Sequence, residues 1–193
     1  AARSTQDEYS RSVALSGLAP HLPAELMPEV LEIARGIQDE DVLAHALSGL
    51  APYLPSEVMP EALEIARGIQ DERFRSYAFS SLAPHLPAEM LIEALEITRG
   101  IWDEGYRTRT LADLAPRLSP ELLPEVLAEA LAAARGIQDE ESRASALSDL
   151  VPYMPPDLLP DVLAEALAVA RGIKFEYARA SALSDLAPYL PPE

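Results

Sequence analysis

The chain contains no cysteine, only three histidines and one tryptophan, and aromatic residues make up 6% of it. Without cysteine, disulfides, thiolate metal sites and cysteine nucleophiles are excluded. Basic residues are also scarce, with 15 Lys and Arg against 32 Asp and Glu, so the net charge is −17. Because such a field repels phosphate groups and anionic lipids, we expect neither nucleic acid nor a membrane as a partner.

Long hydrophobic runs are missing too. No apolar run approaches the roughly 18 to 20 residues that cross a bilayer. The opening AARSTQDEYS lacks the apolar segment of a signal peptide. We therefore expect a cytoplasmic protein. With 193 residues, of which 49% are hydrophobic, the chain is long enough to bury a sizeable core.

An internal repeat organises the whole chain. The motif GIQDE at Gly36 returns at Gly68, as GIWDE at Gly100, as GIQDE at Gly136 and as GIKFE at Gly172. Successive copies are therefore 32, 32, 36 and 36 residues apart. Residues 14–40 and 46–72 differ at only four of 27 positions. A fixed period of this length is typical of a repeat array.

Each repeat is predicted to form two helices, which we call helix A and helix B. Asp39 is a candidate N-cap for a helix A that runs to Pro52, because apolar residues recur there at helical spacing. Helix B should cover about residues 56–67, with Pro60 in its first turn after a short preliminary turn. Gly36 is predicted to take the left-handed conformation that often ends a helix.

Copies four and five are longer by four residues, which adds about one turn to helix B. The whole chain should contain six A helices and five B helices, from near Gln6 to near Leu190. We expect residues 1–193 to form a single repeat domain in which short and long repeats meet near residues 100–136. Because both ends stop at a helix A without a polar capping repeat, the chain is interpreted as a segment of a longer array.

The pattern resembles α-solenoids of the HEAT, armadillo and tetratricopeptide type. The unit LAPHLPAELMPEVLEIARGIQDE also resembles helical repeats found in bacterial signalling proteins with nucleotide-binding switch domains. This resemblance implies an all-α, right-handed solenoid of about eleven helices that recognises a protein ligand. The chain has no GxxxxGK[ST] loop, so the nucleotide activity of those proteins does not carry over.

No enzymatic chemistry is predicted. His21 and His85 occupy equivalent turns two repeats apart, and His45 lies on a helix A, so the three histidines are not expected to converge. The Asp-Glu pairs lack the ligand spacing of a calcium loop and suit the first turn of a helix instead. We therefore expect no catalytic residues, no cofactor and no metal site.

A binding scaffold conserves its core and varies its contact surface. Leu50 and its equivalents recur in every copy and should be core. Three sets of positions vary between copies. Two of them lie four residues apart on helix A and the third lies in the turn after it, so the sets should form adjoining stripes. The sets are Tyr9, Asp41, Arg73, Gly105, Glu141 and Tyr177; Val13, His45, Tyr77, Arg109, Ser145 and Ser181; and His21, Tyr53, His85, Arg117, Tyr153 and Tyr189.

The central copies concentrate the residue types that dominate binding hot spots, which are Trp, Tyr and Arg. Arg75 and Arg107 are set aside because Arg11, Arg143 and Arg179 occupy the same repeat position, where they should pair with neighbouring carboxylates. Phe79 replaces a core leucine. The candidate protein-binding surface consists of Arg73, Tyr77, Trp102, Tyr106, Arg109, Arg117, His45 and His85.

Two questions stay open at this point. Trp102 stands where other copies carry Gln or Lys, and it is either a ligand anchor or a filler at the junction of short and long repeats. The chain itself is either a module that binds a protein or peptide, with acidic partners favoured by its arginines, or a structural array that associates with itself through exposed terminal helices.

Overall fold

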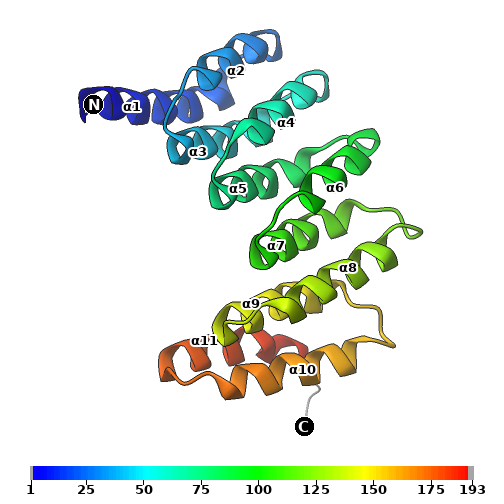
Figure 1. The fold of residues 1–193 in the computed structure, drawn as a ribbon. Coiled ribbons are helices and arrows are strands. Elements are labelled where there is room, and N and C mark those ends of the chain that lie inside the picture. Colours follow the sequence, from blue (N-terminus) through cyan, green and yellow to red (C-terminus); the bar gives the residue numbers. More distant parts are fainter. Residues whose placement is uncertain (1, 191–193) are drawn as a thin grey trace. The chain divides into compact units, whose positions relative to one another are not determined.

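The computed structural model describes the backbone of residues 2–190 and the side chains of residues 7–190, and within this part every regular element is helical. Eleven α-helices follow one another in these residues (Figure 1). The A helices are α1 (Ala2–Leu18), α3 (Glu40–Leu50), α5 (Glu72–Leu82), α7 (Glu104–Leu114), α9 (Glu140–Leu150) and α11 (Glu176–Leu186). The B helices are α2 (Met27–Arg35), α4 (Met59–Gly68), α6 (Leu91–Arg99), α8 (Leu123–Gly136) and α10 (Leu159–Gly172). The predicted all-α repeat and its alternation of six A and five B helices are confirmed.

The proline-rich turns are short 3-10 helices. One such turn follows each helix A, at Ala19–His21, Ala51–Tyr53, Ala83–His85, Ala115–Arg117, Val151–Tyr153 and Ala187–Tyr189. A second precedes each short helix B, at Ala24–Leu26, Ser56–Val58 and Ala88–Met90. Pro60 lies in the first turn of α4, where its missing N–H breaks no hydrogen bond, as predicted. The lengthening of copies four and five is confirmed, since α8 and α10 have 14 residues and α2 has 9.

The chain divides into two compact units, residues 1–101 and residues 102–193. In the first unit α1 packs on α3 and α3 packs on α5, and α2 and α4 form a second layer against them (Figure 1). In the second unit α7 packs on α9 and α9 on α11, with α8 and α10 packed against these A helices. The prediction of a single domain over residues 1–193 stays a prediction.

The core of each unit consists of leucines and alanines at equivalent repeat positions. Leu50, Leu82, Leu114, Leu150 and Leu186 are at most 1% exposed, as the sequence predicts. The prediction is wrong for Leu18, the equivalent residue at the end of α1, which is 53% exposed. Phe79 is 2% exposed and belongs to the same core. Burying a leucine side chain stabilises the fold by about 1.5 to 3 kcal/mol, so this recurring position is a main source of stability in every repeat.

The starts of α3 and α5 are fixed by two carboxylates, one from the same repeat and one from the repeat before. Asp71 caps α5 by accepting a hydrogen bond from the N–H of Arg73 at 2.9 Å. Glu40 of the preceding α3 accepts from the N–H of Gln70 at 2.8 Å and of Asp71 at 2.9 Å. Glu8 makes the same pair of bonds one repeat earlier, to the N–H groups of Gln38 and Asp39. These carboxylates set the register between neighbouring repeats.

The glycine that ends helix B does not adopt the predicted left-handed conformation. Gly36 has φ −73° and ψ −5°, and no residue in the described part of the chain has a positive φ. The helix tightens instead, because the N–H of Ile37 donates to the carbonyl of Ala34 at 2.9 Å, after which the chain turns extended. In the second unit a Cβ on Gly136 would lie 2.6 Å from Cδ of Glu104, so a larger residue here would displace that carboxylate, whereas a Cβ on Gly172 would make ordinary contacts at 3.7 to 3.8 Å.

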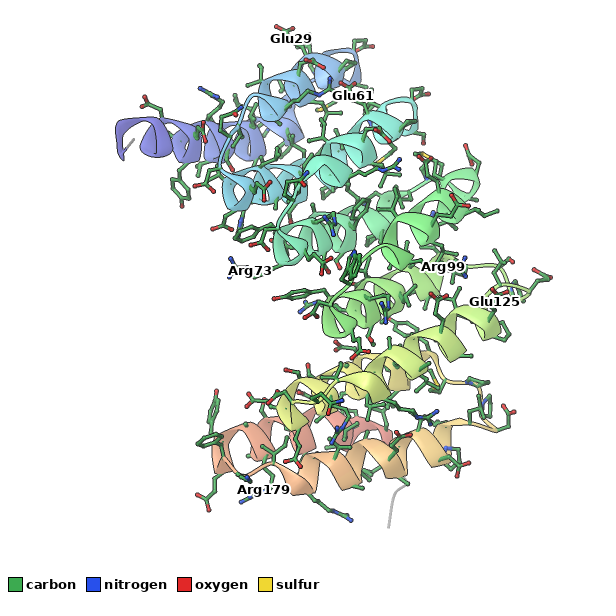
Figure 2. All side chains as sticks on the ribbon, viewed as in Figure 1. Glu29, Glu61, Arg73, Arg99, Glu125 and Arg179 are labelled. Carbon is green, nitrogen blue, oxygen red and sulfur yellow. The ribbon has the colours of Figure 1, made fainter. Side chains whose placement is uncertain are left out.

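The arginine that recurs on helix A, at Arg75, Arg143 and Arg179, has a structural role, as predicted. Its main partner is a backbone carbonyl and not the predicted carboxylate. Arg75 Nη1 donates to the carbonyl of Ile69 at 3.0 Å, and its Nη2 donates to Glu72 at 3.1 Å. Arg143 donates in the same way to the carbonyl of Ile137 and Arg179 to that of Ile173. Figure 2 labels Arg179 among the helices of the second unit. The carbonyl contact holds the extended turn against helix A.

Candidate binding surface

In the first unit two of the predicted surface residues meet. The imidazole of His45 on α3 and the phenol ring of Tyr77 on α5 lie with their centroids 5.0 Å apart, and the Tyr77 hydroxyl donates to Ser48 at 3.2 Å. His45 Nδ1 also lies 3.1 Å from a carboxylate oxygen of Asp41. The second stripe of variable positions is therefore continuous across these two helices.

Arg73 and His85 lie apart from this pair. Arg73 is exposed beside the first turn of α5, with its guanidinium carbon 4.1 Å from the centroid of the Phe74 ring (Figure 2). His85 is exposed in the 3-10 turn after α5. The four predicted residues of this unit thus form one contact pair and two separate exposed side chains.

In the second unit the variable positions line two grooves along the A helices. The first groove, of about 620 Å³, lies between α7 and α9 and includes Tyr106 and Arg109. The second, of about 480 Å³, extends across α7, α9 and α11 and includes Tyr153 and Tyr189. Arg109, Ser145 and Asp149 line both, so the two grooves meet at these residues.

Acidic side chains dominate these grooves. Apart from Arg109, every charged residue lining them is acidic, namely Asp103, Glu104, Asp113, Asp139, Glu141, Asp149 and Asp185. Aromatic side chains supply the remaining large surfaces. The combination suits a ligand that carries positive charge and flat or apolar groups between the charges.

Asp149 stands at the meeting point of the grooves. Partial burial raises the pKa of its carboxyl above the ordinary value of 3.8, and the nearby carboxylates of Asp113 and Asp185 raise it further, while Arg109 lowers it. The residue keeps substantial solvent exposure along the groove. Burial and the charges of Asp113 and Asp149 also raise the pKa of the Tyr153 phenol. A positive charge bound beside these two groups would lower both the pKa of Asp149 and the pKa of Tyr153.

The three aspartates of this cluster were not among the predicted site residues. Asp113, Asp149 and Asp185 occupy one repeat position, at which the first three copies carry Gly17, Gly49 and Ser81. The signal was present in the sequence, because this position lies four residues beyond the second variable set on the same helix face. Its change from small residues to aspartate coincides with the change from the first unit to the second.

Of the predicted residues in the second unit, Tyr106 and Arg109 come together in the first groove. Arg117 is exposed in the 3-10 turn after α7 and is not among the groove-lining residues. The Trp102 side chain is 87% exposed, so it fills no cavity of its own unit. It immediately precedes Asp103, which lines the first groove.

Comparison with known proteins finds no matching family model, no matching curated protein and no matching solved structure. Within the described residues, no three His, Asp or Glu side chains are arranged to hold a metal ion. In the same part of the chain no helix has the length and apolar character needed to cross a membrane.

Proposed function

We propose that this protein is a non-enzymatic helical-repeat module that binds a basic peptide segment of a partner protein along the A-helix grooves of residues 102–190. The observation that carries the proposal is the pair of meeting grooves lined by seven acidic residues and one arginine. Their volumes, about 620 and 480 Å³, are typical of ligand sites. The lining includes positions that vary between repeats, such as Arg109, Glu141 and Tyr153, beside invariant ones such as Glu104 and Pro152.

The charge of the grooves changes the partner expected from the sequence. The arginines of the central copies favoured an acidic partner, but only Arg109 among them lines a groove, and it is surrounded by carboxylates. An acidic peptide would be repelled by these carboxylates, whereas Lys or Arg side chains would be attracted. The net charge of −17 adds a long-range attraction for the same partners.

The hydroxyl groups near the grooves support a binding role over catalysis. The Ser148 hydroxyl donates to the carbonyl of Ala144 at 2.9 Å, and the Thr108 hydroxyl donates to that of Glu104 at 2.7 Å. A nucleophilic hydroxyl needs a general base within hydrogen-bonding distance, and these two hydroxyls donate to helix carbonyls instead. In the first groove the Ser142 hydroxyl donates to Asp139 at 2.7 Å. Hydrogen bonds from the N–H and the hydroxyl of Ser142 hold the pKa of the Asp139 carboxyl below its ordinary value, so this carboxylate is a weak base. The grooves therefore offer charge and shape to a ligand.

We further propose that the module is a HEAT-like, cytoplasmic recognition segment of a larger bacterial signalling protein. Its support is the repeat unit itself, which resembles the sensor repeats of such proteins and folds into the paired helices that they imply. Extending the reading frame beyond both ends of the chain would test this role. A nucleotide-binding switch domain in the same polypeptide is expected, and another kind of neighbour would contradict it.

The binding proposal is tested by isothermal titration with an arginine-rich peptide and a glutamate-rich peptide of equal length. We expect the arginine-rich peptide to bind and the glutamate-rich peptide not to bind. Arg109→Ala should tighten the binding, because it removes a cation that lines both grooves and acts on the Asp149 carboxylate. If Arg109→Ala instead weakens binding, or if only the acidic peptide binds, the proposal is wrong.

A second candidate function, self-association, is favoured by exposed apolar side chains on the first and last A helices. Tyr9 and Val13 on α1 are 63% and 53% exposed, and Phe175 and Tyr177 at the start of α11 are 77% and 89% exposed. Sedimentation at increasing protein concentration distinguishes the two functions. A constant mass of 20.9 kDa is expected of the peptide-binding module. A mass that rises with concentration and falls back in a Tyr177→Lys variant would favour self-association.

A further inference from the structure

The second groove has a periodic arrangement that the first lacks. Asp113 on α7, Asp149 on α9 and Asp185 on α11 occupy equivalent positions on three A helices that pack side by side. Tyr153 and Tyr189 follow the second and third aspartates in the 3-10 turns and line the same groove. We call this set of five residues the aspartate ladder.

The period of the ladder is set by helix packing. Neighbouring packed helices lie about 8 to 10 Å apart, so equivalent side chains on successive A helices repeat at about that distance. A polyproline II chain rises about 3.1 Å per residue with three residues per turn, which places every third side chain on one face about 9 Å apart. A fully extended strand places every second side chain on one face, at only about 7 Å. The spacing of about 9 Å in a polyproline II chain matches the spacing of the aspartate ladder, and the spacing of about 7 Å in an extended strand is too short.

The tyrosines fit the same conformation. Proline-rich chains bind to surfaces where aromatic rings form shallow slots between polar contacts. Tyr153 and Tyr189 offer such rings beside Asp149 and Asp185, and Pro152 and Pro188 line the groove next to them. Prolines between the basic residues of a ligand would therefore contact rings while the basic residues meet carboxylates.

We infer that the aspartate ladder reads a proline-rich peptide in the polyproline II conformation that carries Arg or Lys at every third position. This inference rests on the proposed function and specifies its ligand. Each basic side chain meets one aspartate, so three successive repeats bind three turns of the peptide. Arg109, which lines the groove beside Asp149, competes for that carboxylate and lowers affinity for peptides with a weaker match.

The test uses three peptides of identical composition in isothermal titrations with the full chain. The first is Arg-Pro-Pro-Arg-Pro-Pro-Arg, the second Arg-Pro-Arg-Pro-Arg-Pro-Pro, and the third Arg-Arg-Arg-Pro-Pro-Pro-Pro. We expect the first to bind about fivefold more tightly than the others, because losing one exposed charge pair weakens binding by up to about a factor of five. Emission of the single tryptophan, Trp102, provides a second readout of the titration.

Variants locate the binding to the ladder. The triple variant Asp113→Asn, Asp149→Asn, Asp185→Asn should abolish the preference for the first peptide and weaken its binding by about tenfold to a hundredfold. The matched control removes the same number of charges from the turns and starts of the long B helices, with Glu121→Gln, Asp157→Asn and Asp161→Asn. It should keep the spacing preference. Circular dichroism confirms that each variant is folded.

The outcomes separate this inference from the proposed function. Equal affinity for all three peptides overturns the inference and leaves the basic-peptide function standing. A spacing preference that survives the ladder variant also overturns it, because the preference then comes from other residues. No binding of any arginine-rich peptide overturns both.

Discussion

At the scale of single residues, repeat positions that look interchangeable in the sequence differ in their surroundings. Gly17 and Gly49 occupy the same position of helix A, one repeat apart. A Cβ added to Gly17 would meet no atom within 4 Å, whereas a Cβ on Gly49 would lie 2.6 Å from the Cβ of Ser16. Gly49 therefore allows close approach of α1 and α3, and Gly17 has no such role.

Substituting these two glycines by alanine should have opposite effects on stability. Gly17→Ala gains helix propensity and should raise the free energy of unfolding by about 0.5 to 1 kcal/mol. Gly49→Ala should lower it by about 1 kcal/mol, because the cost of overpacking, about 1 to 3 kcal/mol, exceeds the same gain. Urea denaturation of each variant measures the difference.

A further substitution provides the control for the Gly49 effect. Removing the Ser16 side chain in a Gly49→Ala, Ser16→Gly double variant should restore part of the lost stability beyond additivity. If Gly49→Ala is as stabilising as Gly17→Ala, the close approach of α1 and α3 is not a constraint on this position.

Asp149 is expected to lower the stability of the fold at neutral pH. Since its pKa is raised in the folded state, the folded carboxyl ionises less readily than the unfolded one. The free energy of unfolding therefore falls as the pH rises from the ordinary pKa of 3.8 through the raised pKa of the folded state. Below pH 3.8 the carboxyl is protonated in both states, and Asp149 no longer lowers the stability. Asp149→Asn should raise the unfolding free energy at pH near 7 by about 0.5 kcal/mol or less, because solvent screens the repulsion.

This prediction is checked by urea denaturation of Asp149→Asn and of Asp161→Asn at neutral and at acidic pH. Only the first variant should be stabilised at neutral pH, and its advantage should vanish in acid. A gain that persists in acid would contradict the assigned cause. A residue that destabilises the fold and lines a groove is typical of a functional position.

Sequence reasoning at the residue scale found the varying positions but not which of them share a surface. The pairing of His45 with Tyr77 could be predicted from the repeat alignment, because the two residues occupy equivalent positions on packed helices. The acidity of the groove around Arg109 could not be predicted, because a count of arginines in the central copies ignores which carboxylates surround each one. Local charge depends on packing across helices.

At the scale of elements, the helices were predictable because each start and end has its own local signal. Asp39, Asp71, Asp103 and Asp139 all occupy the N-cap position, and each accepts hydrogen bonds from backbone N–H groups of the first turn. The glycine at the end of helix B was assigned the wrong conformation, because glycine permits a left-handed turn without requiring one. At Gly36 the helix ends in the right-handed region with φ −73°, which any residue can adopt.

The last helix A lacks the aspartate cap of α3, α5, α7 and α9, which gives a prediction about α11. Phe175 occupies its N-cap position, makes no side-chain cap hydrogen bond and is 77% exposed. Phe175→Asp should supply a carboxylate to the free N–H groups of the first turn and raise the unfolding free energy by about 1 kcal/mol. Thermal unfolding followed by circular dichroism measures the change.

The reciprocal variant Asp139→Ala is the matched control for Phe175→Asp. It removes the cap of α9, whose carboxylate accepts from the N–H of Ser142 at 2.7 Å, and should lower the unfolding free energy by about 1 to 2 kcal/mol. If Phe175→Asp leaves the melting temperature unchanged while Asp139→Ala lowers it, the start of α11 is not limited by capping.

At the scale of the whole molecule, the excess of negative charge acts on folding and on binding at once. With 32 acidic and 15 basic residues the folded chain repels itself. Its ion pairs offset little of this, because pairs such as Arg35 with Glu32 and Arg67 with Glu64 have side chains at least 50% exposed. A compact chain with this charge should therefore be more stable when salt screens it.

Salt should accordingly change stability and ligand binding in opposite directions. Raising the ionic strength from about 0.01 M to 0.15 M shortens the screening length from about 30 Å to about 8 Å. The melting temperature should rise, since repulsion among the 32 acidic residues is screened. Over the same range the affinity for Arg-Pro-Pro-Arg-Pro-Pro-Arg should fall, because the attraction between the peptide and the groove carboxylates is screened as well.

Calorimetric scans and titrations in sodium chloride measure both the melting temperature and the peptide affinity on one sample, and sucrose at equal osmolality controls for effects of solute exclusion. If salt strengthens peptide binding together with stability, apolar contacts rather than the aspartates hold the peptide.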